Sequence, residues 1–539
     1  MSPGRLIQQD EYDFIICGGG TSGCVVAGRL AEYFSDARIL LIEAGAHNKD
    51  LENVHMVGGW SKNFDTENDW NLVSKPMKGV DGRQVKLSRG RFLGGSSGVN
   101  GTLVVKGTKQ DYDDWDLPGW SGDEMFEYMR RAEKFNDKDW FHPDPKTPHG
   151  SKGYLNTEPH DLAPISKLML QSMESQGLPM IPDLCSNGNC AHGCGHAART
   201  HHKGVRSTGA DFVTNKNHRE NIEILTDATV DKINFDTTDG SKPRAVSVSL
   251  AVAGSNKRTV HASKEIIISG GAYCTPAVLM RSGIGPRFEL LNHNIPLLVD
   301  SPGVGQNLLD HLITFAFYEV NQSNLTNDHL VYHSPEAALN AYELYKSTKT
   351  GVLSTFPFGA FGFARLDDRL ASSQLWQAAT RRAPAGRDAM ALTPSQPHIE
   401  FFTTELYGGP KQYVDFPINQ QHAFAMITEL FSPRSKGTVT LASADPAENP
   451  IIDHNYLADP LDLLVMTEGL QLGNEIVTRG SGTRDLIKGS WPPSSKHHTY
   501  TERSQWEDYA RQHATTCYHA AGTAKMGKDG DPMAVLDHT

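Results

Sequence analysis

A glycine-rich turn near the N-terminus limits the possible folds more than any other feature of this 539-residue sequence. The apolar run from Tyr12 to Cys17 reads as a short buried strand, and Gly18, Gly20 and Gly23 follow it in the spacing G-x-G-x-x-G. Residues 24–34 then read as a helix. A strand, a glycine turn and a helix in this order predict the start of a Rossmann-like α/β sheet.

Each glycine of this turn has a separate physical role. Gly18 permits the tight passage from strand to helix, Gly20 lets a pyrophosphate approach the backbone, and Gly23 lets the helix pack closely on the strand. A pyrophosphate would then lie on the positive N-terminus of the helix, beside Thr21 and Ser22. The turn therefore predicts a dinucleotide site.

A carboxylate stands where such a site needs one. Residues 38–42 form a second expected strand, and Glu43 ends it, 20 residues beyond Gly23. A carboxylate at this distance accepts hydrogen bonds from an adenosine ribose and repels a 2′-phosphate, so NADP is disfavoured. A glycine-rich turn that binds nothing is the competing interpretation, and the turn alone does not separate NAD from FAD.

Two later segments extend the surface that suits a phosphate group. Residues 90–100 are rich in glycine and serine, so their backbone N–H groups are accessible to a polar ligand. Residues 271–285 follow the apolar run 265–269, which again reads as a strand, a glycine turn at Gly271 and a helix. The sequence thus predicts two such turns in one sheet.

These two segments are similar to the signature segments of the glucose-methanol-choline (GMC) oxidoreductases. The N-terminal strand–GGGTSG–helix–LIEAG stretch and the run from Val304 to His311 also resemble that family, and the four motifs follow the family's order over nearly the whole chain. Residues 396–400 and 432–453 look most like fungal alcohol and formate oxidases. The first signature departs from the family at Val104, where an aromatic residue or alanine is usual.

The resemblance implies an α/β fold with two domains. A Rossmann-like FAD-binding domain would comprise residues 1–160, 200–315 and 505–539, and a substrate-binding domain built on an antiparallel sheet would comprise residues 161–199 and 316–504. Within the second domain we expect strands at 398–402, 423–430 and 438–441, and an exposed helix and loop insertion at 366–397.

The resemblance also implies FAD as the cofactor. Its AMP part would lie on the first glycine turn and Glu43, the loop from Arg91 to Asn100 would follow the pyrophosphate and flavin, and the backbone of Val230 would contact the adenine. Family members with covalent flavin carry a histidine in the segment equivalent to 94–100, which has none here, so we expect non-covalent FAD. The expected cofactor-binding residues are Gly18, Gly20, Thr21, Ser22, Gly23, Glu43, Arg91, Gly95, Ser96, Asn100, Val230 and Gly271.

A histidine near the C-terminus is the candidate catalytic residue. The segment from Cys517 to Gly527 resembles the family's H-x-x-G-T-x-x-M-G motif and places His519 on the family's catalytic histidine. Hydride leaves the substrate carbon for flavin N5 as the substrate hydroxyl loses its proton, and a histidine, with an ordinary pKa of about 6.5, suits that proton transfer at neutral pH. We therefore expect His519 to be the general base.

The implied reaction is the oxidation of a small alcohol, or of an aldehyde or formate-like donor, with O₂ or another electron acceptor. Two alternatives stay open, namely a non-redox enzyme on the same flavin fold, of the cyclase or dehydratase kind, and an inactive flavin-binding remnant. The remnant is considered because the sequence ends at Thr539, before the family's second catalytic side chain. No second catalytic residue is therefore assigned.

Composition bears on partners and location. Lys plus Arg is 51 and Asp plus Glu is 63, a net charge of −12, so the chain would repel the phosphate backbone of a nucleic acid. No apolar run approaches the roughly 20 residues that cross a bilayer, so we expect no membrane partner. The polar N-terminus lacks the apolar core of a signal peptide and the seven cysteines are an odd number, which predicts a cytoplasmic protein, with a peroxisomal location as the alternative.

A segment rich in cysteine and histidine raises the question of a metal. Zinc is one interpretation of Cys185, Cys190 and Cys194, but the spacing C-x4-C-x3-C lacks the paired C-x2-C pattern of zinc ligands. We expect a thiol-rich surface loop there and no metal. The nearby basic residues are interpreted as a solvated rim and not as an anion site; they are Arg199, Lys203 and Arg206.

Overall fold

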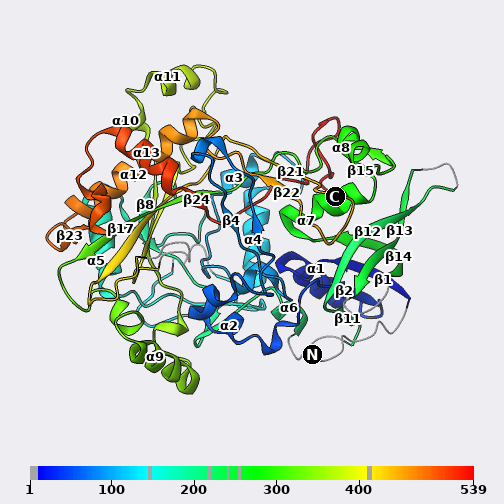
Figure 1. Ribbon diagram of the computed structural model, residues 1–539, viewed down its shortest axis with the longest axis horizontal. Coiled ribbons are helices and arrows are strands. Elements are labelled where there is room, and N and C mark those ends of the chain that lie inside the picture. Colours follow the sequence, from blue (N-terminus) through cyan, green and yellow to red (C-terminus); the bar gives the residue numbers. More distant parts are fainter. Residues whose placement is uncertain (1–9, 144–148, 215–219, 239–241, 253–256, 409–414) are drawn as a thin grey trace.

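A six-stranded sheet organises the N-terminal part of the chain and lies at the right of Figure 1. The computed structural model describes residues 10–143, 149–214, 220–238, 242–252, 257–408 and 415–539. In spatial order the strands are β11 (Ile222–Leu225), β2 (Ile39–Ile42), β1 (Glu11–Cys17), β14 (Arg258–Ile268), β13 (Arg244–Val252) and β12 (Ala228–Asp236). The first four run parallel, and β13 and β12 continue the sheet in antiparallel fashion.

The central strand β1 is apolar because both of its faces are covered. Phe14 and Ile16 pack in the cluster that includes helix α1 (Thr21–Tyr33), and Ile15 packs on the opposite face with Leu40. Side chains alternate across a strand, so a parallel strand with two covered faces needs a continuous apolar run, and each buried side chain contributes about 1.5–3 kcal/mol. The predicted strand, turn and helix are confirmed, although the helix begins earlier than expected.

An eight-stranded sheet occupies the other side of the molecule, at the left of Figure 1. Its strands in spatial order are β23 (Ile487–Ser490), β17 (Leu312–Val320), β20 (Ala423–Leu430), β19 (Ile399–Thr404), β18 (Phe358–Ala364), β8 (Gly193–His196) and β7 (Met180–Asp183), and β24 (Thr515–Thr516) pairs with β17. The strands predicted at 398–402 and 423–430 are β19 and β20, which are antiparallel neighbours. The predicted strand at 438–441 lies outside this sheet, because β21 (Thr438–Thr440) pairs with β22 (Ile451–Asp453) as a separate ladder.

Helices cover the two sheets and connect them. The longest is α12 (Pro460–Arg479), which packs on β20 and on α13 (Arg503–His513). The other helices are α2 (Glu52–His55), α3 (Lys109–Asp113), α4 (Gly122–Ala132), α5 (Pro164–Ser175), α6 (Asp211–Thr214), α7 (Gly271–Arg281), α8 (Arg287–Asn292), α9 (Pro335–Thr348), α10 (Asp367–Leu370) and α11 (Gln374–Thr380). Within the described ranges, no helix combines the length and the apolar character that a bilayer crossing requires.

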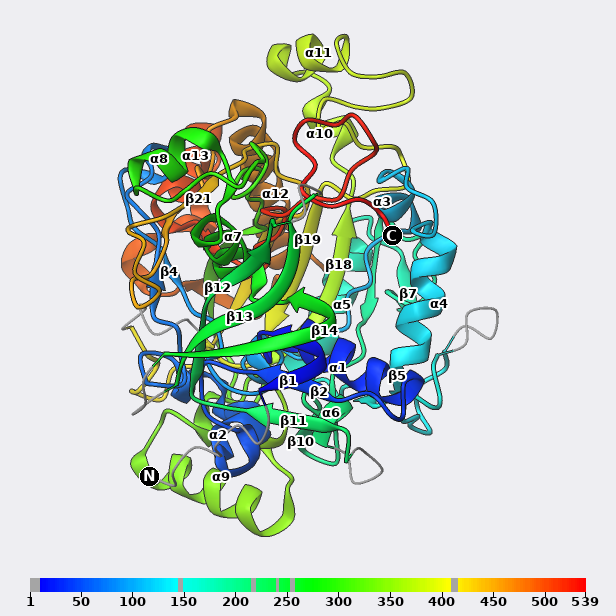
Figure 2. The ribbon, with the colours of Figure 1, turned by 90° about the vertical axis from the view of Figure 1, so that its right-hand side faces the viewer.

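Short ladders complete the structure. They are β3 (Leu72–Val73) with β4 (Lys86–Leu87), β5 (Glu133–Phe135) with β6 (Leu155–Thr157), β9 (His201–His202) with β10 (Val205–Arg206), and β15 (Ile284–Gly285) with β16 (Val299–Asp300). The segment 366–397 carries α10 and α11 and extends away from the rest of the chain in Figures 1 and 2. The expectation that this insertion is exposed holds only in part, because Leu370, Trp376 and Met390 are buried.

The three clustered cysteines correct a second expectation, since they are buried and do not form a surface loop. Cys185 and Cys190 pack with Phe361 and Phe363 of β18, whereas Cys194, on β8, packs with Ala360 and its neighbours on the other face of the sheet. Burial raises the pKa of the Cys190 thiol to about 11 and that of Cys194 to about 12. Their apolar surroundings therefore favour neutral thiols that act as small hydrophobic side chains.

The expected domain boundaries follow the division between the two sheets only in part. All six strands of the first sheet fall inside the segments assigned to FAD binding. The proposed boundary at 315/316 falls inside β17, and β24, assigned to the same part, pairs with the second sheet. Strand β17 lies wholly in the second sheet, so the expected boundary does not coincide there with the division between the sheets.

A buried histidine between two carboxylates links β5 to β7 and predicts a pH-dependent stability. Nδ1 of His149 lies 3.1 Å from Glu133 and Nε2 lies 3.2 Å from Asp183, and the ring stacks on Phe135. Burial disfavours the charged ring, but the hydrogen bonds and charges of Asp183 and Glu133 outweigh it and raise the pKa of His149 from 6.5 to about 9. At neutral pH the imidazolium donates to both carboxylates.

Replacing His149 with glutamine is expected to remove a pH dependence of the free energy of unfolding. Because the folded-state pKa exceeds the unfolded value, the stabilisation is complete below about pH 6.5 and is lost as the pH rises through about 9. Its size is about 2–3 kcal/mol. Urea unfolding at pH 6.5 and 9 measures it: the parent should lose stability over this interval and His149→Gln should lose much less. An equal loss in both proteins would refute the assignment.

Candidate functional site

The first glycine turn lies between β1 and α1 and has the close contacts that demand glycine. Gly18 has a φ of +119°, and a Cβ added to it would lie 2.6 Å from the carbonyl oxygen of Ser269. A Cβ on Gly23 would lie 1.9 Å from the carbonyl oxygen of Gly18, so the helix can approach the strand only without a side chain. Gly20 differs, since a Cβ there would meet no protein atom within 4 Å.

The open side of this turn presents unpaired donors. Helix α1 begins at Thr21, so the N–H groups of Thr21, Ser22 and Gly23 have no partner within the helix. Thr21 and Ser22 are exposed. Donors at a helix N-terminus, together with the helix dipole, form a site suited to a negatively charged group.

Glu43 stands at the end of β2 beside this turn. Its residue is 6% exposed and its Oε1 accepts a hydrogen bond from the backbone N–H of Gly45 at 2.9 Å. Burial raises the pKa of Glu43 to about 7, against the backbone hydrogen bonds that lower it. The start of β12 also reaches this place, because Ala228 N–H donates to the Glu43 carbonyl at 3.0 Å, so Val230 lies two residues from the contact.

The glycine–serine loop packs directly on the turn. Gly94 N–H donates to the Gly19 carbonyl at 2.8 Å, and a Cβ on Gly95 would lie 2.8 Å from Cα of Gly20. Ser96 follows within the 3₁₀ turn Gly95–Gly98. Within the described chain, Nε of Arg91 is buried and has no hydrogen-bond partner.

The second glycine turn lies at the same edge of the sheet. Cys17 pairs with Ile268 in parallel register, so β1 and β14 end together, and Gly271 opens α7 with a φ of +76°. A Cβ on Gly271 would meet no protein atom within 4 Å. The residues expected to bind the cofactor from both turns therefore come together at the carboxyl edge of the parallel strands.

Two arginines interpreted as a solvated rim are instead buried, which is a correction. Arg206 is 3% exposed and donates to Oδ1 and the carbonyl of Asn100 at 2.6 and 2.8 Å. Arg199 is 1% exposed, donates to the Phe358 carbonyl at 2.9 Å and lies over the ring of Phe361. Carbonyl acceptors satisfy part of each guanidinium, whereas Nε of Arg206 and Nε and Nη1 of Arg199 are buried without a partner among the described residues. Arg206 holds Asn100 at the end of the loop.

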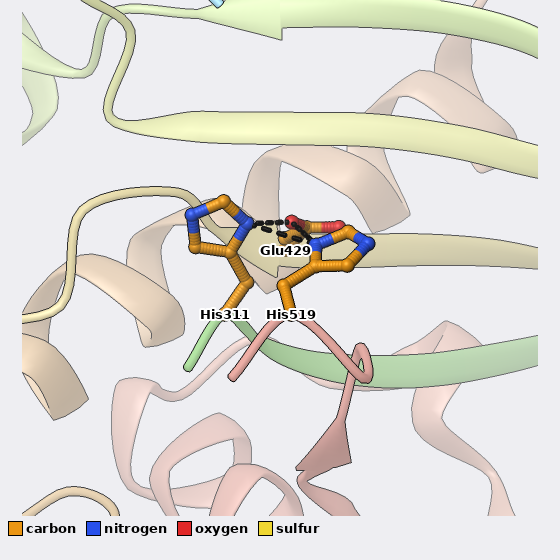
Figure 3. A group of neighbouring side chains, drawn as sticks. All are labelled: His311, Glu429 and His519. Atoms are coloured by element: carbon orange, nitrogen blue, oxygen red, sulfur yellow. Dashed lines mark hydrogen bonds and ion pairs between the residues drawn. The ribbon is translucent and has the colours of Figure 1, made fainter. Parts of the chain in front are cut away.

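His519, the expected base, lies in a cluster with His311 and Glu429 (Figure 3). Nδ1 of His519 is 3.0 Å from Nδ1 of His311, and Oε1 of Glu429 is 2.7 Å from the His311 nitrogen and 3.5 Å from the His519 nitrogen. The side chain of Glu429 is 1% exposed, that of His311 is 22% exposed and that of His519 is 52% exposed. One face of the His519 ring is thus accessible although its Nδ1 side is enclosed.

The fold holds this cluster from several directions. His311 precedes β17, Glu429 lies near the end of β20, and the Cys517 N–H donates to the His311 carbonyl, which continues the pairing of β24 with β17. The backbone N–H of His519 donates to Asp310 at 2.7 Å, and Tyr518 before it has a φ of +65°. A non-glycine residue in this region costs about 1–3 kcal/mol, a cost typical of functional sites.

The two buried carboxyl groups near this cluster have pKa values that are shifted in opposite directions. Glu400 and Glu429 lie opposite each other on β19 and β20, and two such groups cannot both ionise cheaply. Burial raises the pKa of Glu400 far above its usual range, and the charge of Glu429 adds to this. Burial opposes ionisation of Glu429 too, but hydrogen bonding to His311 and His519 prevails and lowers its pKa.

The pKa of His519 moves in the opposite direction. Burial of the Nδ1 side disfavours the charged ring, but the hydrogen bond and negative charge of Glu429 outweigh it and raise the pKa. Cys517 Sγ donates to the second oxygen of Glu429 at 3.1 Å. The cluster therefore contains one stable anion, Glu429, that stabilises positive charge on a neighbouring imidazole.

A cavity of about 640 Å³ opens beside His311. This volume falls within the roughly 300–1,000 Å³ of small-molecule sites. The lining residues are Val105, Gly107, Asp111, Leu309, His311, Met390, Phe431, Ser432, Pro433, Arg434 and Lys436.

Two members of the cluster were not predicted as site residues. His311 ends the run from Val304 that resembled a family motif, but no role was assigned to it, and Glu429 was placed only in a strand. The sequence did contain a signal for Glu429, which is a carboxyl residue within a mainly apolar strand. Glu400 and Glu429 are the acidic residues of the segments 398–402 and 423–430, in which His398 is the other ionisable residue. A carboxyl group in a fully buried strand needs a partner or a function.

Comparisons with known proteins identify the family. The N-terminal GMC oxidoreductase model matches residues 12–313 and the C-terminal one matches residues 433–539. The chain is 30% identical to pyranose dehydrogenase 3 of Leucoagaricus meleagris and 30% identical to an oxygen-dependent choline dehydrogenase of Pseudomonas syringae, each over 99% of this chain and 87% of the relative. A solved formate oxidase of Aspergillus oryzae, a single-residue variant, superposes with a TM-score of 0.88 at 28% identity, over 96% of this chain and 89% of that one.

The protein belongs to the GMC oxidoreductase family. Its fold, an α/β sheet joined to a second, mainly antiparallel sheet, is the fold of these flavoenzymes. The expected fold class and family are therefore confirmed.

Proposed function

We propose that this protein is an FAD-dependent oxidoreductase that oxidises a small alcohol, or an aldehyde or formate-like donor, with His519 as the general base. The observation that carries the proposal is the orientation of the His519 ring. Its Nδ1 faces Glu429 and His311, and its Nε2 points away from both (Figure 3). A histidine fixed through one nitrogen by a carboxylate has the other nitrogen free for proton transfer.

The nucleotide end has the donors and the space that FAD requires. The helix N-terminus at Thr21 and Ser22 offers unpaired N–H groups, the Cβ position of Gly20 is empty, and Arg91 has a buried donor without a partner among the described residues. The residues that would hold FAD are Gly18, Gly20, Thr21, Ser22, Gly23, Glu43, Arg91, Gly95, Ser96, Asn100, Val230 and Gly271. Binding would be non-covalent, because residues 94–100 contain no histidine.

When bound, the flavin would supply the hydride acceptor. The substrate hydroxyl would donate its proton to Nε2 of His519, whose Nδ1 lies 3.5 Å from Oε1 of Glu429. The resulting imidazolium would lie beside the Glu429 anion, which explains why the raised pKa of His519 favours proton uptake. Asp310 holds the His519 backbone and so fixes the ring relative to β24.

The proposal extends to the domains. Residues 1–160, 200–315 and 505–539 would bind FAD, and residues 161–199 and 316–504 would form the substrate side. The location of the six-stranded sheet within the first set and of most of the second sheet within the second set supports this division.

Flavin content is the first test. The purified protein should be yellow, and acid precipitation should release the flavin into the supernatant, because the Gly94–Asn100 loop has no linking histidine. Anaerobic addition of candidate donors, namely choline, pyranose sugars, formate and primary alcohols, should bleach the flavin bands with at least one of them.

Each result distinguishes the proposal from its alternatives. A colourless protein that FAD does not reconstitute would contradict the whole assignment. A yellow protein that no donor bleaches, but that converts a compound without a redox change, would support the non-redox enzyme. Flavin retained in the absence of any reaction would support the remnant.

A further inference from the structure

The His311–Glu429–His519 cluster has a second property besides placing a base. Among the residues that the structure describes, Oε1 of Glu429 is buried and accepts no hydrogen bond of good geometry, although it lies 2.7 Å from Nδ1 of His311. Three potential ligand atoms therefore lie close together, and the two imidazole nitrogens are within hydrogen-bond distance of each other.

Their separations are similar to those of ligands around a small divalent ion, although two of the three are shorter. The three distances are 2.7, 3.0 and 3.5 Å. In a tetrahedral zinc site with bonds of about 2.0–2.2 Å, neighbouring ligand atoms lie about 3.3–3.6 Å apart, so the two shorter separations must lengthen when the ion binds. Two imidazole nitrogens and a carboxylate oxygen are the ligand set of several catalytic zinc sites, in which water takes the fourth position.

We propose that Nδ1 of His311, Nδ1 of His519 and Oε1 of Glu429 bind one Zn²⁺ ion. The outer contacts of a metal site are already present: Cys517 Sγ donates to the second oxygen of Glu429 at 3.1 Å, and Asp310 accepts from the His519 backbone at 2.7 Å. Such contacts fix the orientation of ligands before the metal arrives. Glu429 offers a buried carboxyl group to a cation, and the side chain of His519 is 52% exposed, so the site combines an oxygen ligand with a route of entry.

Zinc in this place would inhibit the oxidation. A neutral imidazole bound to metal through Nδ1 carries its proton on Nε2, so His519 loses the lone pair that accepts the substrate proton. This consequence rests on the proposed function, whereas the binding itself does not. The protein would therefore exist in a metal-free form with an available base and a zinc form without one.

A second group of side chains could also bind a metal ion by its geometry, but it differs from the His311–Glu429–His519 cluster in its charge. Asp367, Asp388 and His398 also bring three ligand atoms together, but Arg365 donates to Asp367 at 2.6 Å and to Asp388 at 2.8 Å. The guanidinium already supplies the positive charge there. In the described structure, no Lys or Arg forms an ion pair with Glu429.

The experiment measures metal binding and flavin reduction on the same chelator-treated, flavin-containing protein. Zn²⁺ affinity is obtained by competition with a chromophoric chelator, and Co²⁺ is added as a spectroscopic substitute that reports tetrahedral coordination. One equivalent should bind. His311→Gln should weaken Zn²⁺ binding by more than about 100-fold, since loss of an outer contact alone costs about 10–100-fold. Asp367→Asn, the matched control in the other group, should bind as the parent does.

The possible outcomes distinguish zinc binding at the cluster from the effect of zinc on flavin reduction. The proposal is overturned if the parent shows no tetrahedral Co²⁺ spectrum and no tight Zn²⁺ binding, a result that needs no variant to fold. It is also overturned if His311→Gln and Asp367→Asn lose affinity equally. Tight binding lost only in His311→Gln, together with flavin reduction that zinc leaves unchanged, would support the metal site and contradict His519 as the base.

Discussion

An alanine at position 519 is expected to slow reduction of the bound flavin by about 10²–10⁴-fold, the usual contribution of a positioned acid–base group. FAD should stay bound, because the residues proposed to bind it lie mainly on and beside the turns of the six-stranded sheet, whereas His519 lies on the loop after β24. The reason for the loss is specific: without the imidazole no group backed by Glu429 accepts the substrate proton. Substrate binding should change much less than the rate of reduction.

Single-turnover reduction under anaerobic conditions is the measurement, so that reoxidation of the flavin does not obscure the step. His293→Ala is a matched control, because Nε2 of His293 also lies 3.5 Å from a carboxylate, that of Glu289, in a position outside the cluster. The control should reduce its flavin at the parent rate. If His519→Ala also does so, His519 is not the base, and the non-redox and remnant interpretations gain support.

The nucleotide end was predictable because its information is local. All of its features lie within one short segment, from the strand at Tyr12 through the three glycines and the helix to Glu43. Two of the glycines allow close packing within the turn, and Gly20 leaves its outer side open. The register of β1 with β14 is not local and was not predicted; the sequence indicated only that the second turn, at Gly271, belongs to the same sheet.

The cluster around His519 was only partly predictable because it depends on pairing between distant strands. His311, Glu429 and His519 come from the edges of β17, β20 and β24, and 118 and 90 residues separate them along the chain. No spacing rule connects residues so far apart. The charge of Glu429 inside an apolar strand was the available signal, and it indicates a partner without naming it.

The wrong expectations share one cause: residues with polar side chains were assumed to be exposed to solvent. Arg199 and Arg206 were assigned to a solvated rim, but they lie in the interior, where backbone carbonyls and Asn100 accept hydrogen bonds from part of each guanidinium. Cys185 and Cys190 were assigned to a surface loop, but they fill an apolar cluster between strands. The sequence shows which hydrogen-bond partners a side chain requires, but only the fold shows whether the backbone provides them in the interior.

Two alanine substitutions in the first glycine turn are expected to have opposite effects on folding and cofactor binding. Gly20→Ala places a methyl group where no protein atom lies within 4 Å, on a residue with an ordinary φ of −71°. The flavin-free protein should lose only about 1 kcal/mol or less, the cost of a poorer helix cap. Affinity for FAD should fall by at least about tenfold, equivalent to about 1.4 kcal/mol, because the methyl group lies where a pyrophosphate must approach.

Gly23→Ala should instead damage the protein itself, because its methyl group would lie 1.9 Å from the carbonyl oxygen of Gly18 and must push helix α1 from strand β1. The free energy of unfolding of the flavin-free protein should fall by about 3 kcal/mol or more. Urea unfolding of the flavin-free forms and titration with FAD, followed by the change in flavin fluorescence, measure the two quantities separately. If Gly20→Ala binds FAD as tightly as the parent, the pyrophosphate does not lie on this turn, and the exposed N–H groups of Thr21 and Ser22 are then left to water.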